Sequence, residues 1–161
     1  MVLDYCYRWT YADNDYGQPR GPGTIMDFCY QGYMLTGERK WIERAAHVLQ
    51  VHRGRDLRLS FQAGIFLEGM RRYYEMSQDQ EAFDYLRQSC DRLLAERKKG
   101  GVTAQAHSFL YVQTGDPKYL QAALDNLPQS GQFNNPGKDF ALSMRNAALC
   151  VSDLHRIAQR Q

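Results

Sequence analysis

Two carboxylates near the start of the chain have the spacing of a candidate acid–base pair. Asp13 and Asp15 lie two residues apart in a segment rich in glycine and proline, and Asp139 could approach them from another loop. Glycoside hydrolysis uses two carboxyl groups, one as the acid and one as the base or nucleophile. An Asp-Asn-Asp sequence next to glycine and proline is also typical of turns and helix caps, and this use is the more common one. The pair therefore indicates either chemistry or a plain turn.

A second candidate chemistry is elimination from a uronate, which needs a base close to a cation that neutralises the sugar carboxylate. Tyr16 and His107 could serve as the base, and Arg20 and Arg58 could supply the cation. A single histidine on a helix is more often a packed or surface residue than a catalytic one. The candidate catalytic residues are Asp13, Asp15, Tyr16 and His107.

Basic and aromatic residues near the same loops are candidates for binding a ligand. Arg55 and Arg58 belong to a cluster of basic residues that could bind an anion, although cations at helix C-termini also complement the helix dipole. Tyr11 and Tyr16 could stack on a sugar ring. The candidate ligand-binding residues are Tyr11, Arg20, Arg55, Arg58, Gln105 and Asp139.

Composition and motifs exclude several classes of function. The chain has 161 residues, of which 43% are hydrophobic and 24% charged, as in a globular protein of one domain. A net charge of +2 is too small to indicate nucleic-acid or membrane binding. We find no phosphate-binding glycine motif, no HExxH and no Cys/His zinc set, so we expect neither a metal nor a cofactor.

The cysteines, the apolar runs and the first residues of the sequence indicate the cellular compartment of the protein. Cys29, Cys90 and Cys150 lie among apolar residues in helical patterns, which predicts buried free thiols, although disulfides remain open. No apolar run is long enough to span a bilayer, and residues 1–4 do not resemble the start of a signal peptide. We therefore expect a cytoplasmic protein.

The elements that must position these residues form a repeated helical hairpin. Three segments share the pattern Tyr-x-x-(Thr/Ser)-x-(Glu/Asp), at residues 33–38, 74–79 and 111–116, and their hydroxyl residues are 41 and 37 positions apart. Gly37 and Gly115 suit the left-handed end of a helix, and the hydroxyls suit local hydrogen bonds. The acidic residue then begins the next helix, where the helix dipole favours it. Each repeat is predicted to be helix, short turn, helix.

The long connections, the helix after the third hairpin and the N-terminal segment complete the predicted organisation. Longer connections are expected at residues 11–23, 53–58, 98–103 and 128–138, so that short turns lie at one rim and long connections at the other. The first helix of a fourth hairpin is predicted from about Asp139 to Ser152. Its apolar side is made of Phe140, Met144, Ala147, Ala148 and Val151. Residues 3–11 alternate apolar and polar side chains, which favours an extended segment slightly over the end of a helix.

The hairpins resemble those of (α/α) toroids, the six-hairpin scaffold of many glycoside hydrolases and polysaccharide lyases. The resemblance covers residues 21–127 and lies in the turn sequences Tyr-Met-Leu-Thr-Gly-Glu-Arg-Lys-Trp-Ile and Tyr-Val-Gln-Thr-Gly-Asp-Pro-Lys-Tyr-Leu, and in the loop Asp-Asn-Asp-Tyr-Gly-Gln-Pro-Arg-Gly-Pro-Gly. It implies a glycan cleft at the rim of long connections. A complete toroid needs about twice this length. Tetratricopeptide-like repeats are a competing resemblance, but their period of about 34 residues is shorter.

These observations together predict one all-α domain over residues 1–161. Residues 1–23 are expected to be irregular or extended, and residues 24–161 to form about three and a half antiparallel hairpins in an incomplete toroid-like arc. The leading functional hypothesis is binding or processing of a glycan, with an acidic glycan as one option and with enzymatic activity left open. The alternative is a non-catalytic helical scaffold for protein interaction or self-association. Both hypotheses predict a homodimer, because an open arc exposes apolar edges.

Overall fold

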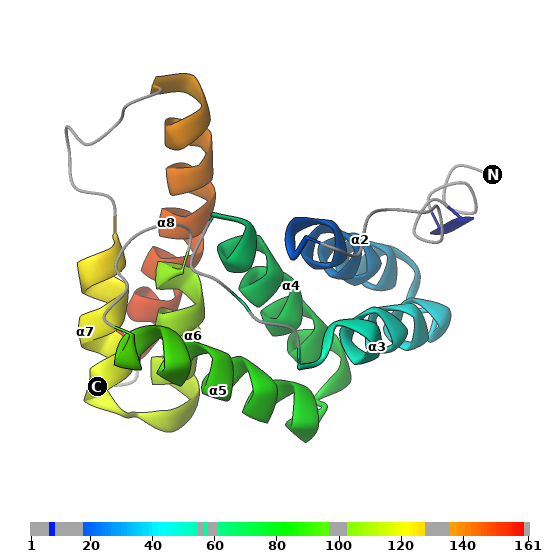
Figure 1. Ribbon diagram of the computed structural model, residues 1–161, viewed down its shortest axis with the longest axis horizontal. Coiled ribbons are helices and arrows are strands. Elements are labelled where there is room, and N and C mark those ends of the chain that lie inside the picture. Colours follow the sequence, from blue (N-terminus) through cyan, green and yellow to red (C-terminus); the bar gives the residue numbers. More distant parts are fainter. Residues whose placement is uncertain are drawn as a thin grey trace. The chain divides into compact units, whose positions relative to one another are not determined.

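The computed structural model describes residues 7–8, 18–54, 57, 61–96, 103–127 and 136–159. Within these ranges it leaves undescribed the side chains of residues 61, 136–143 and 145–146. Over these residues the protein is all-helical, with no strand (Figure 1). The helices are α2 (Arg20–Thr36), α3 (Lys40–His52), α4 (Phe61–Ser77), α5 (Gln80–Ala95), α6 (Ala104–Thr114), α7 (Pro117–Asn126) and α8 (Pro136–Ala158). The predicted all-α class is confirmed.

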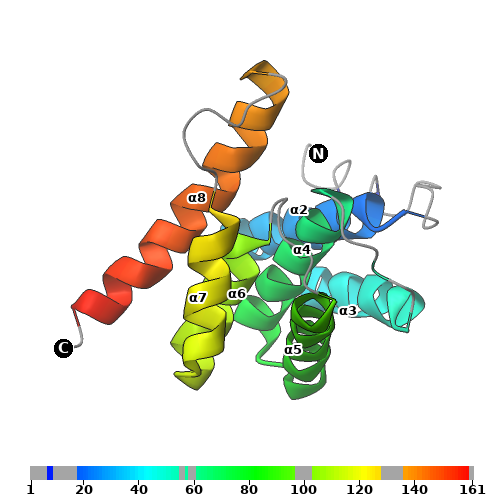
Figure 2. The ribbon, with the colours of Figure 1, turned by 60° about the vertical axis from the view of Figure 1, so that its left-hand side comes forward.

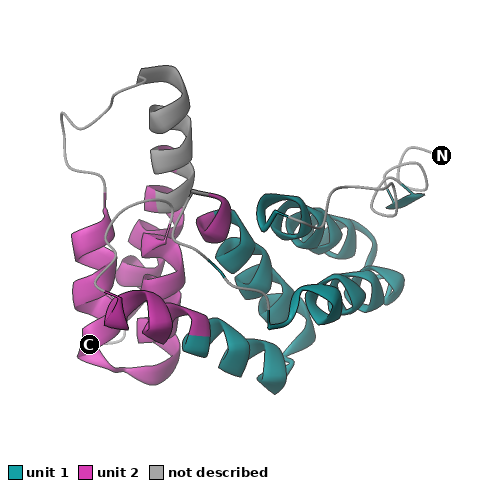
Figure 3. Ribbon diagram, in the orientation of Figure 1, with its two compact units in different colours: residues 1–58, 65–88 teal, residues 59–64, 89–161 magenta. Residues whose placement is uncertain are grey.

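The chain divides into two compact units (Figure 3). Unit 1 comprises residues 1–58 and 65–88, and unit 2 comprises residues 59–64 and 89–161. The division passes through the first turn of α4 and the middle of α5. Each unit is described by itself below, and the single domain stays a prediction.

The three short turns repeat one set of hydrogen bonds, as the sequence predicts. The Thr36 hydroxyl donates to the carbonyl oxygen of Gly32 at 2.8 Å and accepts from the backbone N–H of Glu38 at 3.1 Å. Ser77 and Thr114 make both bonds at the same relative positions. Because the hydroxyl closes the end of one helix and orders the start of the next, this single side chain fixes each hairpin turn.

The turn residues after the hydroxyls adopt the predicted left-handed conformation. Gly37 and Gly115 have φ of 67° and 71°, and Gln78 takes the same position in the middle copy with φ of 57°. Asp79 and Asp116 then begin α5 and α7 by accepting backbone N–H groups through their carboxylates. The repeated hairpin is therefore confirmed at its turns.

Unit 1 is held together by close helix contacts. α2 packs against α3, where the fully buried Trp41 ring covers the α-carbon side of Gly32 and donates its indole N–H to Thr36 at 3.0 Å. α2 also meets α4 backbone to backbone, since a β-carbon on Gly23 would lie 2.5 Å from the carbonyl oxygen of Ile65. We predicted Gly23 at the end of a long loop, but it is buried inside α2, because that helix begins at Arg20.

In unit 2, α6 packs against both α7 and α8 (Figures 1 and 2). The Ser108 hydroxyl donates to the buried carboxylate of Asp153 at 2.7 Å, across a sequence separation of 45 residues. α8 runs past the position of the expected fourth turn, near Ser152, and ends at Ala158.

The predicted apolar side of α8 is partly wrong. Met144 is 51% exposed and Val151 is 59% exposed, whereas Cys150 and Asp153 are buried. The Ser108–Asp153 hydrogen bond turns a polar position of α8 toward α6, which leaves the apolar side facing outward. The side chain of Phe140 lies outside the described residues.

The rims of unit 1 also differ from the prediction. Arg53, at the start of a long connection, pairs with Glu81 at 2.7 Å, and the backbone N–H of Gly54 donates to the Tyr85 hydroxyl at 3.2 Å. Both partners lie in the first two turns of α5, directly after a short turn. The long connection and the short turn meet here instead of lying at opposite rims. In the N-terminal segment predicted to be extended, the two described residues, Tyr7 and Arg8, are helical.

Candidate functional site

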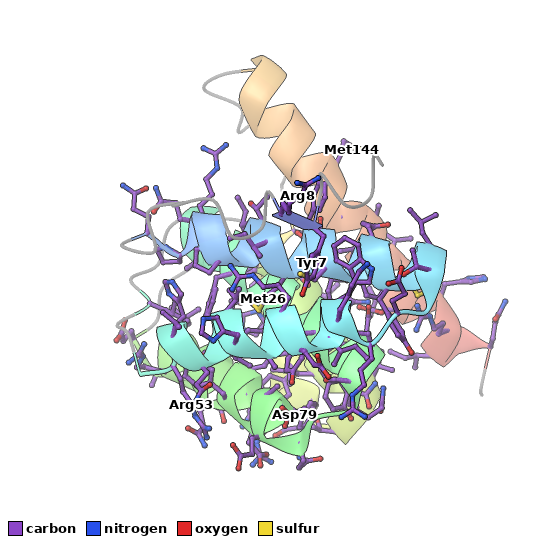
Figure 4. The ribbon with its side chains drawn as sticks, turned by 90° about the vertical axis from the view of Figure 1, so that its right-hand side faces the viewer. Tyr7, Arg8, Met26, Arg53, Asp79 and Met144 are labelled. Carbon is purple, nitrogen blue, oxygen red and sulfur yellow. The ribbon has the colours of Figure 1, made fainter. Side chains whose placement is uncertain are left out.

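A cleft of about 190 Å³ lies where the end of α3 meets the start of α5 in unit 1. We call it the α3–α5 cleft. Figure 4 labels Arg53 and Asp79, which belong to its lining. The full lining consists of Ala46, Leu49, Gln50, Arg53, Tyr73, Asp79, Glu81, Ala82 and Tyr85.

The lining residues of each helix lie about one helical turn apart, which places them on one face of that helix. Ala46, Leu49 and Gln50 lie one turn apart on one face of α3, and Arg53 follows directly after the end of that helix. Residues 81, 82 and 85 likewise share one face of α5. The cleft thus has an apolar part of alanine and leucine between two rows of polar side chains.

Each charged group of the cleft already has a partner. Arg53 forms its ion pair with Glu81. Asp79 accepts the Tyr73 hydroxyl at 3.0 Å through one oxygen and backbone N–H groups at the start of α5 through the other. Burial, followed by the hydrogen bond to Asp79, raises the pKa of Tyr73 to about 12. Tyr73 is therefore neutral at physiological pH and holds the acidic side chain in place.

Two neutral polar groups remain available for a ligand. Among the described residues the Gln50 side chain makes no hydrogen bond, and it is exposed to solvent. The Tyr85 oxygen accepts from Gly54 but keeps its own proton to donate. The cleft can therefore offer an amide and a hydroxyl beside apolar surface, with its ionised groups already satisfied.

Most of the predicted site residues lie outside the described part of the chain. These are Tyr11, Asp13, Asp15, Tyr16, Arg55 and Arg58, and the side chain of Asp139. Their assignment stays a prediction, as does a pocket that joins them to other residues. Arg20 is described: it is the exposed first residue of α2 in unit 1.

His107 and Gln105, the remaining candidates, are buried in unit 2. His107 is 2% exposed, its Nδ1 lies 3.0 Å from the carbonyl oxygen of Thr103, and its Nε2 has no hydrogen-bond partner among the described residues. Nδ1 must carry the proton, since a carbonyl can only accept. Burial lowers the pKa of His107, so the ring is neutral.

The neighbours of His107 do not form a catalytic chain. Ser108 and Asp153 bond to each other, while the imidazole bonds to the backbone of Thr103, so no serine–histidine–carboxylate relay is assembled. His107 also occupies the same repeat position as Cys29 and Met70, seven residues before the turn hydroxyl, and all three are buried. A core position is the simplest account of this histidine.

Sequence reasoning missed the α3–α5 cleft. The pattern of α3 and α5 puts Gln50 and Arg53 on one helix face and Glu81 and Tyr85 on another. Nothing in the pattern says that these two faces meet, because the predicted toroid keeps them at opposite rims.

Comparison with protein families, with curated proteins and with solved structures returns no match. Among the described residues no group of three or more histidine, cysteine or acidic side chains could hold a metal ion, and none of the described helices has the length and apolar content to cross a membrane. The three cysteines that the structure describes, Cys29, Cys90 and Cys150, are buried free thiols, as predicted.

Proposed function

We propose that this protein binds a small, neutral, hydroxyl-rich ligand, such as a single sugar ring, in the α3–α5 cleft. The observation that carries the proposal is that two neutral groups line the cleft beside an apolar surface: the Gln50 amide, and the Tyr85 hydroxyl, which accepts from Gly54 and still has its proton to donate. Ligand pockets for drug-sized molecules usually measure about 300–1,000 Å³. A cleft of about 190 Å³ suits one ring and no more.

The charge of the cleft argues for a neutral sugar over the acidic glycan predicted from the sequence. Asp79 and Glu81 each bring a negative charge, and Arg53 brings the only positive charge of the lining, so the sum is −1. A uronate carboxylate would meet net repulsion and would have to compete with Glu81 for Arg53. Binding without catalysis is the activity we propose, because the cleft holds no carboxyl group free of a partner.

Isothermal titration calorimetry with neutral monosaccharides and the matching uronates tests this proposal. Tyr85→Phe removes one donor without changing the ring, and we expect it to weaken binding by about 2- to 13-fold, as for the loss of one hydrogen bond of 0.5–1.5 kcal/mol. Tyr111→Phe, on α6 in unit 2, is the matched control and should leave the affinity unchanged. Uronate binding as strong as that of the neutral sugar, or equal binding by Tyr85→Phe, would refute the assignment.

The alternative function, a helical scaffold for protein interaction or self-association, is favoured by a different observation. The outward side of α8 exposes apolar residues that the sequence predicts to be packed. This observation does not involve the α3–α5 cleft, so the two functions are independent.

A further inference from the structure

Tyr7 packs against the α2–α3 hairpin of unit 1 through the ring of Trp41 (Figure 4 labels Tyr7). The two ring centroids lie 5.0 Å apart and the ring planes cross at 89°, which is the edge-to-face arrangement that aromatic pairs favour. Trp41 is fully buried and donates its indole N–H to Thr36, so its ring is held in place. Tyr7 therefore rests on a fixed aromatic surface.

The ammonium group of Lys40 contacts both rings. Its Nζ lies 5.2 Å from the Tyr7 ring centroid and 5.6 Å from the Trp41 ring centroid, within the distance of about 6 Å at which a ring attracts a cation. The same Nζ lies 2.7 Å from Oε2 of Glu38. Two rings and a carboxylate thus surround one ammonium group, and we call Tyr7, Trp41 and Glu38 the aromatic cage. Aromatic rings arranged in this way bind alkylammonium ions.

Residues that are close in the sequence build most of the aromatic cage. Glu38 lies in the short turn, Lys40 begins α3 and Trp41 follows it. The Lys40 side chain is 30% exposed, so water screens the attraction of its ammonium group to the rings less than at the open surface. The second ring comes from a distant part of the chain, and Tyr7 supplies it.

We propose that the Lys40 ammonium group fastens residues 7–8 to the α2–α3 hairpin by filling the aromatic cage. Its positive charge attracts the two rings at once, and Glu38 fixes its position. The aromatic cage is thus a site for an alkylammonium group, and Lys40 of the same chain is its occupant. Because each cation–π contact at a partly exposed position is weak, residues 7–8 detach and reattach while the hairpin stays folded. The inference does not depend on ligand binding in the α3–α5 cleft.

Cleavage after Arg8 by an arginine-specific protease measures this detachment, because the rate of cleavage follows the detached population. Lys40→Met keeps most of the aliphatic side chain and removes the charge, so we expect cleavage about 2- to 5-fold faster, as for the loss of one exposed cation–π contact. Lys40→Arg keeps a cation and should be cleaved at the wild-type rate. Lys118→Met is the matched control, since Lys118 lies over the Tyr119 ring at 4.7 Å in unit 2, and its rate should be unchanged.

Rescue by a soluble cation tests the aromatic cage as a binding site. In Lys40→Ala the ammonium group and its stem are absent, and ethylammonium chloride at millimolar concentration should slow cleavage after Arg8 towards the wild-type rate. Sodium chloride at the same concentration should not. The wild type, whose aromatic cage is filled, should be cleaved equally fast with either salt, which controls for effects on the protease. Glu38→Gln, added to Lys40→Ala, should weaken the rescue.

Circular dichroism checks that every variant is folded. If Lys40→Met is cleaved at the wild-type rate, the aliphatic stem alone covers the rings and the proposal is overturned. Faster cleavage of Lys40→Arg that equals that of Lys40→Met, or a Lys40→Ala variant that responds alike to ethylammonium and sodium, would overturn it as well.

Discussion

The contact between α2 and α4 makes a strong prediction about a glycine substitution. In Gly23→Ala the new methyl group would lie 2.5–2.7 Å from the carbonyl group of Ile65 and the α-carbon of Phe66. These atoms belong to the backbone, so no side-chain rotation relieves the contact. The two helices would have to move apart.

The magnitude follows from two opposing effects. Overpacking of a core costs about 1–3 kcal/mol, and the upper end applies here because the contact is with backbone. Alanine is the better helix former by about 1 kcal/mol, which offsets part of that cost. We therefore expect Gly23→Ala to lower the free energy of unfolding by about 2 kcal/mol. With a urea dependence of about 2 kcal/mol per molar, the unfolding midpoint falls by about 1 M.

A second glycine turns this prediction into a double-mutant cycle. Gly69 of α4 faces the same contact, since its added methyl group would lie 2.6 Å from the carbonyl oxygen of Gly23. Once the helices have separated for one methyl group, the second should cost less, so the double variant should lose clearly less than the sum of the two. Urea unfolding followed by tryptophan fluorescence measures all three variants. A Gly23→Ala variant as stable as the wild type, as helix propensity alone would give, would refute the close approach.

Three further outcomes are expected. Thr36→Val should lower the free energy of unfolding by about 1–3 kcal/mol, because the buried indole N–H of Trp41 loses its acceptor. Thr114→Val, the same change in the third turn, should cost less in a parallel urea titration, since no tryptophan N–H among the described residues donates to Thr114. The lowered pKa of His107 means that the folded state resists its protonation, so His107 should stabilise the protein less as the pH falls below the unfolded pKa of about 6.5. His107→Leu should flatten the loss of stability between pH 7 and pH 5, and an unchanged slope would disprove the assignment. Tyr73 and Tyr119 have pKa values raised to about 12, so their neutral forms stabilise the fold below pH 10 and this contribution is lost as the pH rises through 12. Absorbance at 295 nm should lose part of its rise near pH 12 in Tyr73→Phe and in Tyr119→Phe, and an unchanged titration curve in both variants would contradict the raised pKa values.

The hairpins could be predicted because their information is local. The hydroxyl, the left-handed residue and the acidic residue of each turn act within six positions of one another, and a repeated spacing reveals them. The second helix of a hairpin also buries apolar residues at helical spacing, as at Trp41, Ala45 and Leu49 of α3. Leu124 of α7, by contrast, is half exposed, so apolar type alone does not decide which residues of that helix are packed.

The packing between hairpins could not be predicted because it depends on contacts between distant residues. The Arg53–Glu81 pair joins positions 28 residues apart, and neither residue has a pattern that designates the other. The exposure of Val151 follows from the way Asp153 binds Ser108, which a hydrophobic pattern does not report. One signal was present: a glycine inside a helix, such as Gly69, costs stability and therefore indicates a close approach.

The candidate site illustrates the same limit. The sequence directed attention to acidic and basic residues of the long connections, most of which lie outside the described part of the chain. The residues that form the α3–α5 cleft are unremarkable by type, and Gln50 and Tyr85 carry no motif. They come together only because the end of α3 meets the start of α5.

The most direct test of the proposed function is a titration of the isotope-labelled protein with a neutral monosaccharide, followed by two-dimensional amide NMR. We predict that the chemical-shift changes concentrate on residues 46–54 and 79–85, which border the α3–α5 cleft. Changes that concentrate around Arg20 or His107 instead, or no change at millimolar sugar, would contradict the account.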